Sequence, residues 1–229
     1  MPVPDSLTEE YVVPESPTAN TPTDRLKCAG LYLVDQGREK EVATVTGLLE
    51  AKAEDTEPVL KELQRKKILS APDAQKRQVL NHKLLHQLWE SSFIHKLRPR
   101  LQIERCSPTH PWRIGSIPSL IKTSKLEEDV ILGGELAAAF YCDHIEARRA
   151  TLHVERKRAL KLMLQLRLTP DPEGCIDVVA NFSPAIAFPQ RSAEGLLSAE
   201  PYLVHAELMS TEEQQTLIAH QLAQEYFPF

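Results

Sequence analysis

Residues 160–182 read LKLMLQLRLTPDPEGCIDVVANF, and two patterns in this stretch decide the predicted fold. Leucine occupies every second position from Leu160 to Leu168, and a β-strand places alternate side chains on one face. The alternation returns from Ile176 to Phe182, after a segment rich in proline, aspartate and glycine that favours a turn. The stretch therefore predicts a β-hairpin.

The rest of the C-terminal half must cover this hairpin, because two strands alone are marginally stable. Residues 204–208 also alternate and predict a third strand. Residues 135–149 and 212–226 have the apolar spacing of helices. We therefore predict an α+β protein with a helical N-terminal half and a C-terminal antiparallel sheet of at least three strands covered by these helices.

Proline-rich segments divide the chain into three parts. Residues 1–24 contain five prolines and several acids but no basic residue, which predicts a disordered acidic tail. Residues 25–105 predict a mainly helical region, in which Pro72 and Asp73 are typical of the start of a long helix ending near Pro99. A second proline-rich segment opens the predicted α+β domain, residues 106–229.

Composition excludes several classes of protein. The 42% hydrophobic and 26% charged content is ordinary for a soluble globular protein. The sequence has neither an apolar run of about 18 residues nor an N-terminal secretion signal, so we expect a soluble intracellular protein without a membrane span. Its four cysteines occur singly, which argues against a zinc ribbon or a dithiol redox site and predicts buried, reduced thiols.

Two arrangements that include histidine are candidates for a metal site or a catalytic site. His82 and His86 have metal-ligand spacing on a helix, but neither the glutamate of the HExxH motif nor a third ligand accompanies them, so we expect two surface histidines. Cys175 and His205 could meet across the predicted sheet and form a catalytic thiol, although a buried cysteine and an incidental histidine are the simpler interpretation. The common phosphate-binding and serine-nucleophile motifs are absent from the sequence. We therefore predict no enzyme activity, metal or cofactor.

Charge is unevenly distributed along the chain. The net charge is −5, but residues 1–57 sum to −7, residues 58–105 to +7 and residues 145–168 to +5. The basic segments could face an anionic partner or the chain's own acidic segments. The candidate contacts to nucleic acid or another anionic partner are Lys61, Arg65, Lys66, Lys67, Lys76, Arg77, Arg148, Arg149, Arg156, Lys157 and Arg158. For the last five, the lack of interleaved aromatic residues favours a solvated or acid-paired face.

Residues 38–80 combine two helix-like segments with a short connection, and the second segment ends in LQRKKIL. This arrangement resembles the helix-turn-helix part of a winged-helix domain, although a helical hairpin gives the same pattern. The resemblance implies that the second helix presents the basic side chains of residues 61–67 to phosphates. It also requires a wing from residues 70–80, where the sequence favours a helix start instead.

The leading functional hypothesis is a non-enzymatic protein-interaction module, such as an adaptor or a structural subunit of a larger assembly. The alternative is a nucleic-acid-binding protein that uses a winged-helix-like basic region at residues 38–100. A third hypothesis is an unfamiliar enzyme using Cys175 and His205. We expect a protein partner, and leave nucleic-acid binding and self-association open.

Overall fold

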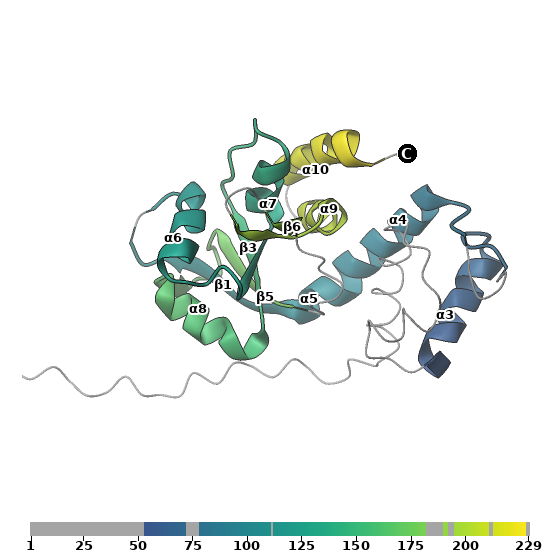
Figure 1. Cartoon of the computed structure of the whole chain (residues 1–229), viewed down its shortest axis with the longest axis horizontal. Helices are drawn as coiled ribbons and strands as arrows, with labels where there is room; N and C mark the ends of the chain where they lie inside the picture. Colours follow the sequence, from purple (N-terminus) through teal and green to yellow (C-terminus); the bar gives the residue numbers. More distant parts are fainter. Residues whose placement is uncertain are drawn as a thin grey trace, which may run out of the picture.

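The computed structural model describes residues 53–71, 78–110, 112–181, 190–191, 195–210 and 213–227. The predicted tail at residues 1–24 lies outside these ranges. The described residues form an α+β fold in which α4 extends away from a central sheet toward α3 (Figure 1).

One mixed sheet of seven strands is present in the described residues, in the order β4-β1-β5-β3-β2-β7-β6. The strands are β1 (Gln102–Pro108), β2 (Val130–Gly133), β3 (Ala150–Val154), β4 (Leu168–Pro170), β5 (Ile176–Ala180), β6 (Gln190–Arg191) and β7 (Leu197–Ser198). β3 is parallel to β5 and β2 is parallel to β7, whereas the other neighbouring pairs are antiparallel. The prediction of an antiparallel sheet was therefore wrong.

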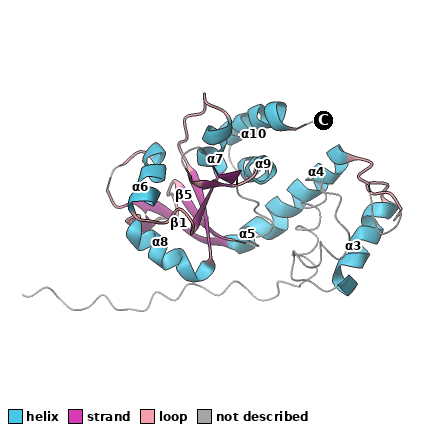
Figure 2. Cartoon of the chain, viewed as in Figure 1, coloured by secondary structure: helices cyan, strands magenta, loops and turns pink. Residues whose placement is uncertain are grey.

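Helices surround this sheet and extend beyond it. They are α3 (Ala53–Arg65), α4 (His82–Ser92), α5 (Arg98–Leu101), α6 (Ile117–Thr123), α7 (Gly134–Tyr141), α8 (Ala159–Gln165), α9 (Pro201–Met209) and α10 (Glu213–Tyr226). α7, α9 and α10 lie together on one side of the sheet, and α6 and α8 lie on the other (Figures 1 and 2). The predicted helix at residues 135–149 ends earlier, at Tyr141, whereas α10 falls close to the predicted helix at residues 212–226.

The predicted hairpin at residues 160–182 does not exist. Its first half is mainly helix α8, where Leu162 is buried and Leu164 is 70% exposed, so these two leucines lie on different faces. The buried residues of this region are Ala159, Leu162, Met163 and Leu166, which have helical spacing. β4 and β5 are not neighbours, because β1 lies between them and pairs with both.

The predicted strand at residues 204–208 is part of helix α9. This helix packs against α7, α10 and β2, and its residues from Leu203 to Leu208 are all buried. A helix that is covered on nearly all sides has no polar face and therefore no helical period in its sequence. That lack of period allowed a short alternation to suggest a strand.

The long helix predicted to start at Pro72 begins at His82 instead. The Asn81 side chain caps α4 by accepting a hydrogen bond from the Leu84 backbone N–H at 2.9 Å. A π-helical turn, η1 (Phe93–Leu97), joins α4 to α5, and the helical path passes Pro99 to end at Leu101. The proposed domain boundary at residue 105 lies inside β1.

A single hydrophobic cluster joins the helical region to the sheet. Trp89 and Phe93 of the α4–η1 segment are fully buried, with ring centroids 5.2 Å apart. Leu60 of α3, Leu132 of β2 and Leu203 of α9 belong to the same cluster. The described parts of the predicted helical and α+β regions therefore share one core.

The two faces of α8 give the first testable prediction. We expect Leu162→Ala to lower the free energy of unfolding by about 2–5 kcal/mol, because a buried leucine leaves a cavity. Leu164→Ala should change it by less than about 0.5 kcal/mol, because this side chain is exposed. Urea denaturation measures both, and equal losses would contradict the helix, since a strand would place both leucines on one face.

Candidate nucleic-acid interface and buried polar network

Helix α3 has one apolar and one basic face. Val59, Leu60 and Leu63 are buried, whereas Lys61 and the run from Arg65 to Lys67 are exposed. Lys61 and Lys66 lie 3.9 Å and 3.2 Å from glutamates one turn earlier in the helix. Such exposed pairs contribute little energy and exchange readily with other partners. The end of α3 therefore presents a cluster of cationic groups to solvent.

An antiparallel hairpin follows α3 directly. Lys67 adopts a left-handed conformation with φ of 57° just after the helix, and the chain then reverses. Ser70 N donates to Gln78 O at 2.9 Å, Leu80 N donates to Ile68 O at 2.7 Å, and Leu69 pairs with Val79. Residues 68–70 therefore pair with residues 78–80 in the region where the winged-helix resemblance requires a wing and where the sequence favoured a helix start. Lys76 and Arg77 lie outside the described residues.

The second predicted basic cluster, residues 148–158, has a different environment. Lys157 and Arg158 contact Glu155 at 3.1 and 3.3 Å, and Arg158 also contacts Asp129. The Arg149 and Arg156 guanidinium groups each donate to a backbone carbonyl, at 3.3 Å. Several of these cations thus already contact groups of the chain itself.

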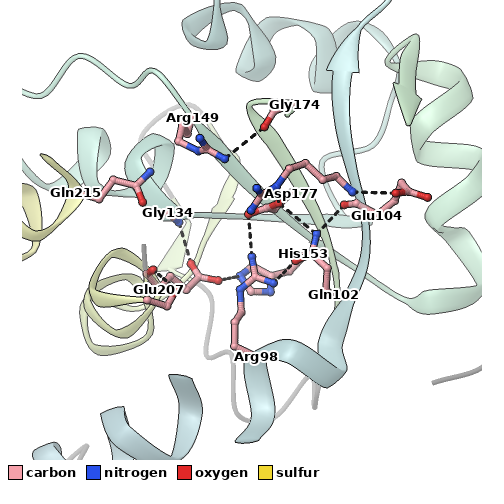
Figure 3. Close-up of polar contacts among 12 residues, drawn as sticks. Arg98, Gln102, Glu104, Gly134, Arg149, His153, Gly174, Asp177, Glu207 and Gln215 are labelled. Carbon is pink, nitrogen blue, oxygen red and sulfur yellow. Dashed lines mark hydrogen bonds and ion pairs between the residues drawn. The ribbon is translucent and has the colours of Figure 1, made fainter. Parts of the chain in front are cut away.

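Three buried carboxylates form a polar network between the sheet and helices α5, α7, α9 and α10 (Figure 3). Asp177 of β5 accepts hydrogen bonds from the Arg98, Gln102 and Arg105 side chains, at 3.1, 3.2 and 2.9 Å. Arg98 also contacts the Gln102 side chain. These bonds tie α5, β1 and β5 together.

Glu207 of α9 lies near the centre of this network. One carboxylate oxygen accepts from the Gly134 backbone N–H at 2.8 Å, and the other lies 2.8 Å from His153 Nε2 (Figure 3). A Cβ at Gly133 would collide with both Glu207 and His153. The consecutive glycines therefore allow the β2–α7 junction to approach a buried carboxylate.

Glu135 of α7 orders the segment that leads into β3. Its carboxylate accepts from the backbone N–H groups of Arg148 and Arg149 at 2.7 and 3.2 Å, and from the Gln215 side chain of α10 at 2.7 Å. An adjoining cavity of about 20 Å³ has room for about one water molecule. These carboxylates are held by hydrogen bonds and ion pairs, so we assign the network a structural role.

Cys175 and His205 have separate surroundings. His205 Nδ1 lies 2.8 Å from Glu90 of α4, and its ring packs against His86 and Phe227. Cys175 precedes β5, where its carbonyl accepts from the Ala150 N–H. His82 and His86 were both predicted to lie on the surface, but only His82 is exposed and His86 is buried. Glu90 could not be singled out from the sequence, because a single acidic residue on a helix face is common.

Comparison with models of known protein families shows to which family the chain belongs. A model described as a transcriptional regulator, the AbiEi antitoxin of a type IV toxin–antitoxin system, matches residues 78–227. The chain belongs to the AbiEi antitoxin family. The match extends from the second strand of the hairpin to the end of α10, about two thirds of the chain. Comparisons with curated proteins and with solved structures found no significant match.

This family assignment favours the predicted nucleic-acid alternative over an adaptor as the leading function. A family described as transcriptional regulators is not a class of enzymes. Among the described residues of this AbiEi family member, no helix is long and apolar enough to cross a membrane.

Replacement of Glu207 tests the polar network. We expect Glu207→Ala to lower the free energy of unfolding by about 3–5 kcal/mol, because it leaves buried polar groups of His153 and Gly134 without their partner. Glu207→Gln should be milder, because its amide oxygen still accepts a hydrogen bond. Urea denaturation provides the values, and a loss below about 1 kcal/mol for the alanine variant would contradict the network's structural role.

The buried thiols give a prediction that depends on pH. Burial, helped by the charges of Glu104 and Asp177, raises the pKa of Cys106 from 9.0 to about 12. Burial and the Glu225 carboxylate raise the pKa of Cys142 from 9.0 to about 11. Both thiols should therefore resist iodoacetamide at pH 8 in the folded protein, while the half-buried Cys175 reacts first among the three cysteines that the structure describes.

The free energy of unfolding should also fall as the pH rises above 9, because the thiols of the unfolded chain lose their protons before those of the folded protein do.

Mass spectrometry of the alkylated native protein locates the residues that iodoacetamide has modified. Rapid native modification of Cys106 or Cys142 at pH 8 would contradict this assignment.

Proposed function

We propose that this AbiEi family member is a transcriptional regulator that binds duplex DNA through α3 and the hairpin at residues 68–80. The observation that carries the proposal is the direct succession of a helix with an exposed basic end and an antiparallel hairpin. A winged-helix protein uses its second helix-turn-helix helix in the major groove and its wing on the flanking backbone. The family's description as a transcriptional regulator supports this function.

The charge pattern of α3 indicates which part of DNA its basic residues would contact. The first half of the helix contains Glu54, Asp55 and Glu57, while Lys61 and Arg65 lie in the second half and Lys66 follows directly after it. Lysine and arginine near a helix end and a wing are suited to phosphate contacts, which position a protein on DNA without reading its sequence. We therefore assign these side chains to the DNA backbone and assign no base contact.

The location of the interface rests on the structure. The family match begins at residue 78, whereas α3 and the first strand of the hairpin precede it. Arg148, Arg149, Arg156, Lys157 and Arg158 are secondary candidates for an anionic partner. Because the Arg149 and Arg156 guanidinium groups already donate to backbone carbonyls, and because a strand pairing directly follows the basic end of α3, we place the principal interface on α3 and the hairpin.

A protein partner is a second part of the proposal. The family description names an antitoxin of a toxin–antitoxin system, so we propose that the chain acts together with a toxin partner. A native pull-down at low and moderate salt, with and without nuclease, tests this. A stoichiometric protein that survives both treatments supports a direct complex, whereas recovery of nucleic acid alone argues against one.

Paired charge-removal variants test the DNA interface. We expect Arg65→Ala/Lys66→Ala to weaken binding to a fluorescent duplex with a mixed sequence, because it removes two phosphate contacts. The slope of log affinity against log salt should become shallower by about 1.8, at about 0.9 for each contact. Fluorescence anisotropy at several salt concentrations measures both effects.

Lys125→Ala/Lys161→Ala is the matched control, because it removes two exposed charges that are not among the candidate contacts. It should bind DNA nearly as the unmodified protein does. Equal weakening of DNA binding by the two double variants would mean that the net charge of the protein, and not the end of α3, determines the affinity. Absence of salt-dependent binding by the unmodified protein would exclude the proposed function.

A further inference from the structure

Three metal-ligating side chains from two helices meet between α4 and α9. His86 and Glu90 are one turn apart on α4, and His205 comes from α9. Glu90 Oε2 lies 3.5 Å from His86 Nε2 and 2.8 Å from His205 Nδ1. The three donor atoms all lie within 4.8 Å of one another. Both imidazoles thus converge on the same carboxylate oxygen.

We propose that His86, Glu90 and His205 bind one divalent first-row transition metal ion, with Zn²⁺ as the best fit. Two imidazoles and a carboxylate form a donor set that suits zinc, with a water molecule as fourth ligand. Metal–ligand bonds of about 2.0–2.2 Å at tetrahedral angles place donor atoms about 3.3 Å apart. The two separations from Glu90, 2.8 and 3.5 Å, lie close to that value, and all three donor atoms are within 4.8 Å, so small side-chain movements complete the site.

The surroundings hold these ligands in place. His86 and His205 are 6% and 7% exposed, and their ring centroids are 5.1 Å apart. The Phe227 ring lies 4.9 Å from His86 and 5.0 Å from His205, and stacks on Tyr202 at 4.4 Å. Packed aromatic rings restrict the imidazole rotamers and limit access of water, which strengthens electrostatic interactions at the site.

The Glu90 carboxylate is already placed as the shared ligand. Its side chain is 20% exposed, and one of its oxygens faces both imidazoles. A metal ion would replace these contacts with shorter bonds to the same three atoms. Because α4 leads back to the hairpin and α3, the bound ion would fasten the proposed DNA-binding element to α9.

The experiment uses the full-length protein after treatment with a chelator and dialysis. Titration with Zn²⁺ in a calorimeter and with Co²⁺ in a spectrophotometer measures stoichiometry, affinity and the type of ligand. We expect one equivalent of either metal, and a cobalt spectrum of nitrogen and oxygen ligands without a thiolate-to-metal band. Glu90→Gln and His205→Gln should each weaken binding at least about tenfold.

His82→Gln is the matched control, because His82 lies one turn before His86 on α4 but is exposed and outside the triad. It should bind metal as the unmodified protein does. Circular dichroism establishes that each variant is folded. If a variant does not fold, NMR of the imidazole nitrogens in the unmodified protein takes its place as the test. Addition of Zn²⁺ should then shift the resonances of His86 and His205 alone.

Several results would overturn the proposal. They are absence of stoichiometric binding, unchanged affinity in the folded Glu90 and His205 variants, a thiolate band in the cobalt spectrum, and imidazole shifts at His82, His95 or His220 instead. None of these readouts depends on DNA binding, so the metal site and the proposed function succeed or fail separately.

Discussion

The burial of α9 is the constraint on which the rest of the structure depends. Because this helix is covered on nearly all sides, its polar side chains must find partners inside the protein. Glu207 does so through Gly134 and His153, and His205 does so through Glu90. These contacts fix the β2–α7 junction and the position of α4 against α9. An unpaired carboxylate at this depth would be strongly destabilising.

The proposed activities follow from how charge is divided between the interior and one end of the molecule. In the sheet region, the buried carboxylates of Glu135, Asp177 and Glu207 contact arginine and histidine side chains and backbone N–H groups. The exposed cations of α3 lie at the far end of α4, away from the sheet (Figure 1). An anionic partner such as DNA can therefore approach the basic end without disturbing the buried network, and the sheet region remains available for a protein partner.

Among the helices, the sequence prediction came closest at α10, where a polar face accompanies an apolar one. α10 has such a face and fell within one residue of its prediction. Leucines of α8 at every second position matched a strand even though the buried set has helical spacing, and α9 has no polar face at all. The basic residues of α3 could be named from the sequence as candidate contacts to an anionic partner, because the charge of a side chain follows directly from its residue type. Two other features could not be predicted from the sequence, because they depend on tertiary structure. These are the pairing of Ile68–Ser70 with Gln78–Leu80 and the contact of Glu90 with His205.

Hydrogen–deuterium exchange of the full-length protein, with and without duplex DNA at low salt, tests the central claim most directly. The account predicts slower exchange on binding in the end of α3 and in residues 68–71 and 78–80, with α8 and the sheet unchanged. Ala71 and Gln78 are exposed, so their amide hydrogens should exchange quickly unless a partner covers them. Protection confined to α8 and the segment at residues 148–158, with α3 and the hairpin unaffected, would contradict it.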